Sequence, residues 1–420
     1  MHRTIAAVLA AGACASSLQA QTDRIVAPAP ILTLAEALER AGASSPFQDA
    51  AAAGIRAAEA QRRVAGLRPN PSIIGEAENV AGTGIYQGLR SSETTVGLAL
   101  PLELGGKRSA RIAVAGAQIG RAGLQAEIAR ADLRLRVTQT YPAAIAAQRR
   151  VGIAQDQVVI AAEVLRGARV RVQAGRASPL EEQRADVARI AAQGALERAR
   201  RSADTATGNL ARLIGTSVGQ LDREWFDAVP TPSTPRHSAA SGSLAVAAAR
   251  ANLDTATAQV RLARSQRVPD LTVSASARRL EQTNDVAAVF GISIPLNVFN
   301  NGRAAIAVAE AQREQSDAQR RVALLDVEQD VAMAQAEADN AATTARNAAG
   351  PALAAATEAA RIARIGYREC KFGQLDLLDA ERTLLDTRTT ATDALAALHD
   401  AQARLERLTV AAPRPQEYPR

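Results

Sequence analysis

The sequence TTVGLALPLELGGKRSARIAVAGAQ, residues 94–118, predicts a strand that is followed by a long helix. Apolar side chains occupy every second position from Val96 to Leu102, with smaller or polar residues between them. This two-residue period is typical of a half-buried strand. Gly105 and Gly106 end the strand, and an Ala- and Arg-rich stretch that favours helix begins directly after them.

A second copy of this pattern, AVFGISIPLNVFNNGRAAIAVAEAQ, occupies residues 288–312. It has the same alternation, a break at Asn301-Gly302 and a second Ala-rich helix. One offset of 194 positions relates three matched pairs: Gly97 with Gly291, Pro101 with Pro295, and Ala115 with Ala309. Because chance rarely gives one offset to glycines, prolines and alternating apolar residues together, we interpret the chain as an internal duplication.

The composition favours long, closely spaced helices over a thick aromatic core. Of the 420 residues, 47% are apolar but only 2% are aromatic, so the apolar mass is mostly alanine, valine and leucine. Such helices suit coiled-coil contacts with their neighbours. The net charge of +7 does not indicate a nucleic-acid partner, because the arginines are interleaved with acids, as at residues 197–204, without stacking aromatics beside them.

The chain offers few residues for metal binding or catalysis. It contains three His, two Cys and two Met, which excludes an obvious cage of soft or imidazole ligands. His2 lies in the leader, His237 in a linker and His399 near a helix end, with no nucleophile motif close by. We therefore expect neither an enzyme nor a bound cofactor.

The first 20 residues, MHRTIAAVLAAGACASSLQA, are typical of a signal peptide. His2 and Arg3 form a short basic start, an apolar segment follows, and cleavage is expected near Ala20. The alternatives are lipid attachment at Cys14 and an uncleaved segment. No run of 18 or more apolar residues follows, so we expect an exported protein that is soluble beyond the inner membrane or spans an outer membrane as strands.

The first structural repeat is expected over residues 21–214. Helix caps, prolines and glycines divide it. Its expected elements are a helix at about 33–67, strands at about 72–80 and 94–104, a helix from 107 to about 174 interrupted at Tyr141-Pro142, and a helix from Ser178 to about 214.

A Ser-, Thr- and Pro-rich linker at residues 215–242 separates this repeat from the second one at residues 243–410. The expected elements of the second repeat are a helix at 243–267, strands at about 270–279 and 288–298, a helix from 303 to 365 broken at Gly350-Pro351, and a last helix at about 374–410. The Pro-rich residues 411–420 are expected to form a disordered tail.

The four predicted strands have the length of tilted membrane strands, about ten residues each. Four strands cannot close a membrane barrel, and open sheet edges are not tolerated in lipid. If the strands span a membrane, the chain must therefore oligomerise. A small soluble sheet on a helical protein is the alternative, since few aromatic residues lie near the expected interfaces: Tyr86, Phe290 and Phe299.

The duplicated pattern, together with the motifs GYREC at residues 366–370 and DLLDA at residues 376–380, resembles the TolC-like outer-membrane efflux proteins. The stretch LPLELGGKRSARIAVA, residues 100–115, is most similar to the members that serve RND-type export pumps for cobalt, zinc and cadmium. The resemblance covers residues 32–410.

This resemblance implies a mainly α-helical fold with a small transmembrane β part, assembled as a homotrimer. Three chains would form a twelve-stranded barrel in outer-membrane lipid, continued by an α-helical barrel in the periplasm. The segment 215–242 would belong to a belt around the middle of the helical barrel. The protein would act as a passive exit duct with a periplasmic adaptor and an inner-membrane RND transporter.

Heavy-metal cations are the cargo that the resemblance favours. The alternatives are a duct for drugs or other organic compounds, or one for type I secretion. A protein of another class, a soluble periplasmic coiled-coil scaffold, would keep the helices and make the strands a minor sheet.

The resemblance also implies a periplasmic entrance at the two turns between helices. Tyr367 matches the constriction tyrosine of the family, and Asp376 and Asp379 match its entrance acids. An offset of 195 positions places Glu181 at the equivalent of Asp376 and Arg184 at the equivalent of Asp379. Three chains would then form rings of negative charge that favour cations. The alternatives are ordinary solvated carboxylates and a tyrosine that packs the turn.

Overall fold

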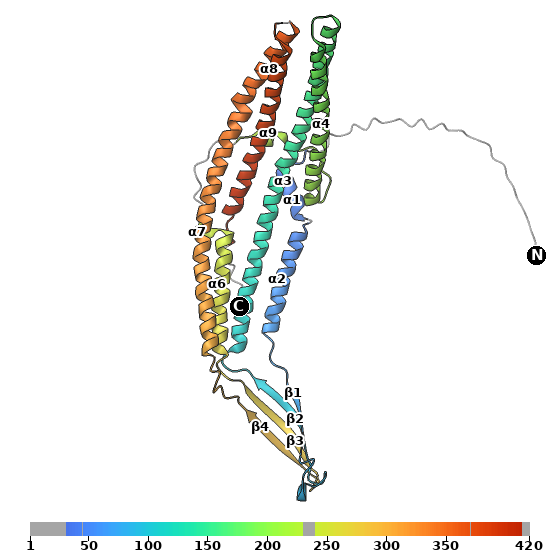
Figure 1. Ribbon diagram of the computed structural model, residues 1–420. Helices are drawn as coiled ribbons and strands as arrows, with labels where there is room; N and C mark the ends of the chain where they lie inside the picture. Colours follow the sequence, from blue (N-terminus) through green and yellow to red (C-terminus); the bar gives the residue numbers. More distant parts are fainter. Residues whose placement is uncertain (1–30, 44, 230–239, 370, 414–420) are drawn as a thin grey trace, which may run out of the picture.

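The computed structural model describes residues 31–43, 45–229, 240–369 and 371–413. The molecule is elongated, with a β-sheet at one end and two helical hairpin tips at the other (Figure 1). The expected signal peptide at residues 1–20, the candidate lipid site Cys14 and most of the expected tail lie outside the described residues.

The first half of the chain contains two strands and both arms of one helical hairpin. Its elements are α1 (Leu34–Ala43), α2 (Pro46–Ala65), β1 (Ser72–Glu78), β2 (Glu93–Leu102), α3 (Lys107–Gln173) and α4 (Pro179–Ile214). At 1.5 Å per residue, the 67 residues of α3 extend over about 100 Å. This helix therefore connects the sheet to the first hairpin tip.

The second half repeats this order after a short connecting helix. Its elements are α5 (Arg223–Asp227), α6 (Leu244–Ser265), β3 (Leu271–Leu280), β4 (Asp285–Ser293), α7 (Arg303–Asn347), a π-helical turn (Ala348–Ala352), α8 (Leu353–Arg368) and α9 (Gln374–Thr409). Short 3₁₀ turns lie at Gly84–Tyr86 and Ala240–Gly242.

The four strands form one antiparallel sheet in the order β1-β2-β3-β4. The central β2–β3 pair joins the two repeats, with Glu93 opposite Leu280 and Leu102 opposite Leu271. The fourth strand was expected at about 288–298, and this prediction is wrong at both ends. It begins at Asp285, directly after the turn that pairs it with Leu280, and ends at Ser293, shortly before Pro295, which has no N–H to donate.

The single helix expected at about 33–67 is divided in two. Ser45 has an extended backbone, with φ −88° and ψ 120°, and its hydroxyl accepts a hydrogen bond from Phe47 N at 3.3 Å. Pro46 begins α2. A residue before proline is driven out of the helical region, so the chain turns here and a new helix starts at the proline.

Two predicted helix breaks are absent from the structure. Helix α3 continues through Pro142, which is buried, because side chains packed on both sides of the proline, including Tyr141 and Ile145, compensate for the lost backbone hydrogen bond. Gly350 and Pro351 lie in the π-helical turn, which joins α7 to α8 without a break. Its wider hydrogen-bonded ring accommodates the proline within the helix.

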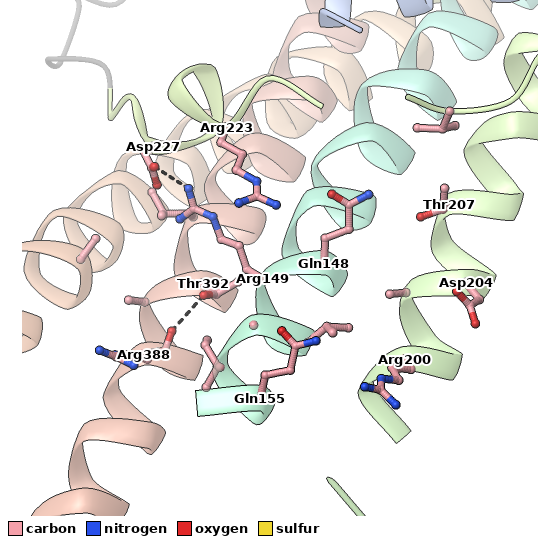
Figure 2. A pocket seen from close by; sticks show the side chains of 18 of the residues that line it. Gln148, Arg149, Gln155, Arg200, Asp204, Thr207, Arg223, Asp227, Arg388 and Thr392 are labelled. Atoms are coloured by element: carbon pink, nitrogen blue, oxygen red, sulfur yellow. Dashed lines mark hydrogen bonds and ion pairs between the residues drawn. The ribbon is translucent and has the colours of Figure 1, made fainter. Parts of the chain in front are cut away.

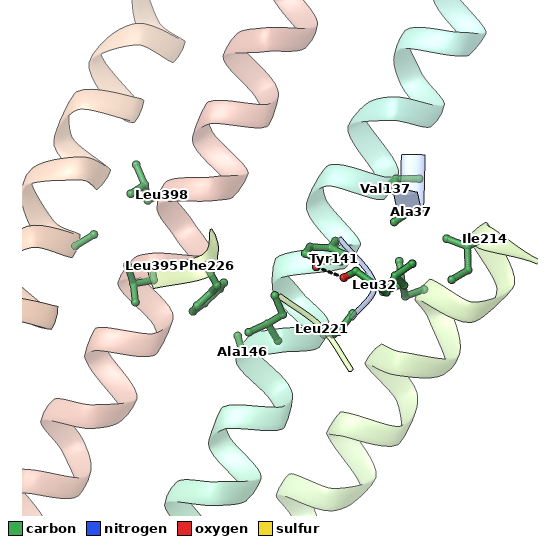
Figure 3. Packing of buried hydrophobic residues seen from close by; sticks show 14 of the residues in the cluster. Leu32, Ala37, Val137, Tyr141, Ala146, Ile214, Leu221, Phe226, Leu395 and Leu398 are labelled. Atoms are coloured by element: carbon green, nitrogen blue, oxygen red, sulfur yellow. Dashed lines mark hydrogen bonds between the residues drawn. The ribbon is translucent and has the colours of Figure 1, made fainter. Parts of the chain in front are cut away.

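The main hydrophobic core lies at mid-height, where α5 contacts α3 and α9 (Figure 3). The Tyr141 hydroxyl donates to Leu32 O at 2.5 Å and accepts from Asp222 N at 3.0 Å. Phe226 is fully buried, and the Nε2 atom of His399 lies 3.0 Å from its carbonyl oxygen. These contacts attach the segment between the repeats to the long helices.

A polar joint connects the sheet to the helices. Arg111, in the first turns of α3, forms a two-pronged ion pair with Glu103, and its Nη2 atom lies 2.9 Å from Oε2. The same guanidinium donates to the carbonyl oxygens of Ala65 at 3.2 Å and Leu67 at 3.1 Å. The hydrogen bond from Arg111 lowers the pKa of Glu103, so the pair remains charged at neutral pH.

Candidate functional site

Two helical hairpins meet at the end of the molecule that is farthest from the sheet (Figure 1). Their turns lie between α3 and α4 and between α8 and α9. A small apolar cluster packs them together, with Val164, Leu165 and Ala168 from α3, Ala185 from α4, Ala363 from α8 and Leu377 from α9. The turns are therefore held side by side.

Glycine and serine shape the first turn. Gly175 has a φ of +68°, a left-handed conformation that glycine adopts without strain, and ends the hairpin arm. The Ser178 hydroxyl accepts a hydrogen bond from Leu180 N at 3.3 Å, and Pro179 is the first residue of α4. The expected cap at Ser178 is present.

The second turn folds back onto a glycine. The backbone amides of Lys371 and Phe372 donate to Gly366 O at 2.8 and 3.2 Å. A β-carbon at position 366 would overlap the Phe372 ring, so this turn requires glycine. The Asp376 carboxylate accepts a hydrogen bond from Gly373 N at 2.9 Å and caps the start of α9.

Tyr367 and Glu181 lie around one arginine, Arg171. The guanidinium carbon of Arg171 is 5.3 Å from the centre of the Tyr367 ring, and its Nη1 atom is 3.9 Å from Glu181 Oε2. That distance fits an ion pair but exceeds a hydrogen bond. Among the described residues, neither this carboxylate oxygen nor the buried Tyr367 hydroxyl has a hydrogen-bond partner. This is an unusual state for buried polar atoms.

The two hairpins are also joined by a direct hydrogen bond. The Gln374 side-chain amide donates to Glu181 O at 3.3 Å, and Gln374 is only 6% exposed. The first turn of α9 is therefore attached to the first turn of α4. Neither Gln374 nor Arg171 was predicted, because the sequence does not distinguish them from the other glutamines and arginines on these helices.

Asp376 and Asp379 lie on the exposed side of α9. Asp376 is bound to its own helix start, whereas Asp379 makes no side-chain hydrogen bond or ion pair within the part of the chain that the structure describes. Residues three positions apart share a helix face. The structure thus brings Tyr367 and Glu181 together and places the two aspartates on the surface.

Ion pairs connect the arms of the hairpins between the turns and the middle of the molecule. Arg364 on α8 forms a two-pronged pair with Glu381 on α9, with Nη2 and Oε2 2.8 Å apart. This hydrogen bonding raises the pKa of Arg364. Arg388 on α9 reaches Asp156 on α3 at 3.1 Å. The first pair joins the two arms of one hairpin, and the second joins helices more than 200 positions apart in sequence. Sequence patterns do not predict either pair.

A cavity of about 1070 Å³ lies between α3, α4 and α9, beside α5 (Figure 2). Four arginines line it, from different elements: Arg149, Arg200, Arg223 and Arg388. Arg149 is paired with Asp227, and Arg388 with Asp156. The lining holds no cysteine, serine–histidine pair or carboxylate pair suited to catalysis.

Within the described ranges, no three His, Cys, Asp or Glu side chains come together to hold a metal ion. Among the same residues, no helix is both long and apolar enough to cross a membrane.

Comparison with known proteins identifies the family. The outer membrane efflux protein family matches residues 37–216 and 236–410. The cobalt-zinc-cadmium resistance protein CzcC of Cupriavidus metallidurans is 35% identical over 295 residues, 68% of each chain. The nickel-cobalt-cadmium resistance protein NccC of Alcaligenes xylosoxydans xylosoxydans is 31% identical over 309 residues, 73% of this chain and 70% of its own.

The fold agrees with this relationship. The solved structure of CusC superposes with a TM-score of 0.75 at 18% identity and covers 90% of this chain and 92% of its own. These findings confirm the expected resemblance and the mainly helical fold with a small sheet. The family consists of channels and not of enzymes, as expected. A soluble periplasmic scaffold is excluded, and the chain belongs to the outer membrane efflux protein family, as an outer-membrane channel with a periplasmic helical part.

Proposed function

We propose that three copies of the chain form one exit duct for heavy-metal cations, with residues 21–214 and 243–410 as its two repeats and 215–242 as its belt. The observation that carries this proposal is the sheet. Strands β1 and β4 are its two edges, and each has a neighbour on one side only. Unpaired edges cannot face lipid, so the edges of neighbouring copies must pair, which yields twelve strands in a closed barrel.

An exposed apolar face of the sheet supports membrane insertion. One face of β2 presents Val96, Leu98 and Leu100, which are 56%, 58% and 41% exposed. Phe290 and Ile292 on β4 belong to the same face and are 81% and 74% exposed. A row of exposed large apolar side chains is stable when lipid covers it.

The cargo follows from the relatives. CzcC and NccC are both named for resistance to cobalt and cadmium, with zinc or nickel as the third metal. This favours metal cations over drugs, other organic compounds or type I secretion substrates. A duct conducts its cargo without binding it tightly, so a resident metal site is not required. A periplasmic adaptor and an inner-membrane RND transporter would supply the cargo and the energy.

The entrance of the duct would lie at the hairpin tips. Glu181 and Tyr367 would line the constriction around Arg171, and the exposed Asp376 and Asp379 would form the acidic rings of the assembled trimer. Repeated carboxylates around a narrow pore attract cations and repel anions. The separate hydrogen bond of Asp376 to Gly373 N keeps that carboxylate at the turn.

Membrane fractionation, detergent extraction and size analysis test the assembly. We expect the chain in the outer-membrane fraction, in a species with three times the mass of the 43.8 kDa chain. A monomeric or dimeric species after mild extraction would contradict the shared barrel.

Planar-bilayer recordings test the entrance. Asp376→Ala combined with Asp379→Ala is expected to lower the permeability of K⁺ relative to Cl⁻. The control is Asp326→Ala combined with Asp330→Ala, which removes the same charge from exposed positions on α7, far from the tips. Equal selectivity of the tip variant and the wild type would exclude the acidic rings as a filter.

A further inference from the structure

One arginine, Arg278, joins three strands of the sheet. From β3, its Nη1 atom lies 2.8 Å from Glu93 Oε2 on β2, and its Nη2 atom lies 2.9 Å from Glu78 Oε2 on β1. Its Nε–H donates to the Thr95 hydroxyl at 3.0 Å. The guanidinium thus uses all three of its nitrogens on neighbouring strands.

The strand pairing shows which face carries this arginine. Directly opposite residues of antiparallel strands share a face. Arg278 lies opposite Thr95, and the same face continues with Ser276 opposite Gly97 and Ser274 opposite Ala99. Small and polar residues dominate this face, which also carries Ile74, Val289 and Leu280. The exposed apolar row of Val96, Leu98, Leu100, Phe290 and Ile292 lies on the other face. In a barrel, the small and polar face lines the water-filled lumen.

On the face of the sheet that carries Arg278, the charged side chains are mostly acidic and lie near the turns between the strands. Four carboxylates have the same parity as Arg278 in the strand pairing: Glu76, Glu78, Glu93 and Asp285. Within the four described strands, Arg278 is the sole Lys or Arg on this face. It neutralises part of an otherwise acidic ring.

The next residue, Arg279, provides a natural comparison. It lies opposite Thr94 and therefore on the other face of the sheet. There it contacts Glu281 at 3.2 Å and donates to the Asn284 side-chain oxygen at 3.0 Å. Both arginines are at the same height along β3, but they differ in the face that they occupy.

We propose that Arg278 is a specificity-determining residue of the duct, whose lumen-facing guanidinium limits the preference for cations at the outer end of the barrel. This inference rests on the proposed trimeric barrel. Each trimer would carry three such guanidinium groups against twelve carboxylates. Fixed charges that line a narrow aqueous passage set its local ion concentrations.

The test is the reversal potential of wild-type and variant trimers in planar bilayers under a KCl gradient near 0.1 M. Arg278→Gln should raise the K⁺/Cl⁻ permeability ratio by roughly two- to tenfold, because fixed charges set surface potentials of several kT. Glu93→Gln should lower the ratio, and Arg278→Lys should keep the wild-type ratio because the charge remains. Arg279→Gln removes the same charge from the other face and should leave the ratio unchanged.

Salt dependence separates electrostatics from a structural disturbance. At 1 M salt the Debye length falls to about 3 Å, so the effect of Arg278→Gln should shrink strongly. If Arg278→Gln alone does not assemble, the double variant Arg278→Gln with Glu93→Gln, compared with Glu93→Gln alone, still measures the effect of the guanidinium. Equal ratios for wild type and both variants would overturn the role of Arg278 while leaving the duct intact. Absence of conductance and of trimers in the wild type would instead overturn the proposed function and this inference with it.

Discussion

Removing one hydroxyl group, in the variant Tyr141→Phe, should loosen the attachment of the segment between the repeats. Tyr141 is fully buried, and its hydroxyl bonds to two backbone groups, Leu32 O at 2.5 Å and Asp222 N at 3.0 Å. Phenylalanine keeps the ring and its edge-on contact with Trp225, whose centre is 5.4 Å away. The variant therefore isolates the two hydrogen bonds.

The magnitude follows from the groups left behind. An unsatisfied buried donor or acceptor costs about 1–3 kcal/mol, so two such groups should lower the free energy of local opening by about 2 kcal/mol or more. Since about 1.4 kcal/mol corresponds to a factor of ten, amide exchange in this segment should accelerate by roughly thirtyfold.

Hydrogen–deuterium exchange of the detergent-solubilised protein measures this change. Peptides that cover residues 220–227 should exchange faster in Tyr141→Phe, whereas peptides from the middle of α4 should not change. Tyr86→Phe is the matched control, because Tyr86 lies in the short 3₁₀ turn between β1 and β2 and is 44% exposed. An acceleration below about threefold at residues 220–227 would refute the assignment of these two hydrogen bonds as the attachment.

Two further predictions concern the same core and the second hairpin turn. Burial lowers the pKa of His399 in the folded protein below the ordinary histidine pKa of about 6.5. As the pH falls through this value, the unfolded chain therefore binds a proton more readily than the folded one, and stability decreases. The midpoint temperature of thermal unfolding should therefore decrease as the pH is lowered from 7.5 to 5.5. His399→Gln should reduce this decrease, and identical pH profiles for the variant and the wild type would contradict the role of His399. Gly366→Ala should open the second turn at a cost of about 1–3 kcal/mol, because the new methyl group meets the Phe372 ring. Trypsin should then cleave faster at Lys371, while Gly54→Ala, where the added carbon meets nothing within 4 Å, should leave cleavage unchanged.

The sequence predicts the strands and long helices well because their signals are local. The alternation from Val96 to Leu102 and the glycines after it specify a strand and its end within a few residues, and Ser178 specifies a helix start. The proline at position 142 misled the prediction because its cost is local, whereas the burial that compensates for it comes from distant helices.

The candidate site is only partly accessible to sequence reasoning for the same reason. The family pattern predicts Tyr367 and Glu181 as entrance residues, but it does not predict their common neighbour Arg171. The chain carries many helical arginines in similar local surroundings, and only the packing of two hairpins distinguishes one of them. Gln374 became evident in the same way, through a bond to a residue almost 200 positions away, Glu181.

The π-helical turn at Ala348–Ala352 bears on the history of the gene. The buried alanines Ala115 and Ala309 are 194 positions apart, whereas the buried alanines Ala168 and Ala363 are 195 apart. One extra residue therefore entered the second repeat between these points, and a π turn, whose hydrogen bond encloses one residue more than that of an α-helix, absorbs one without breaking the helix. We infer that a single inserted codon survives here, and that α3 and α4 align with α7 to α9 once a one-residue gap is placed at this turn.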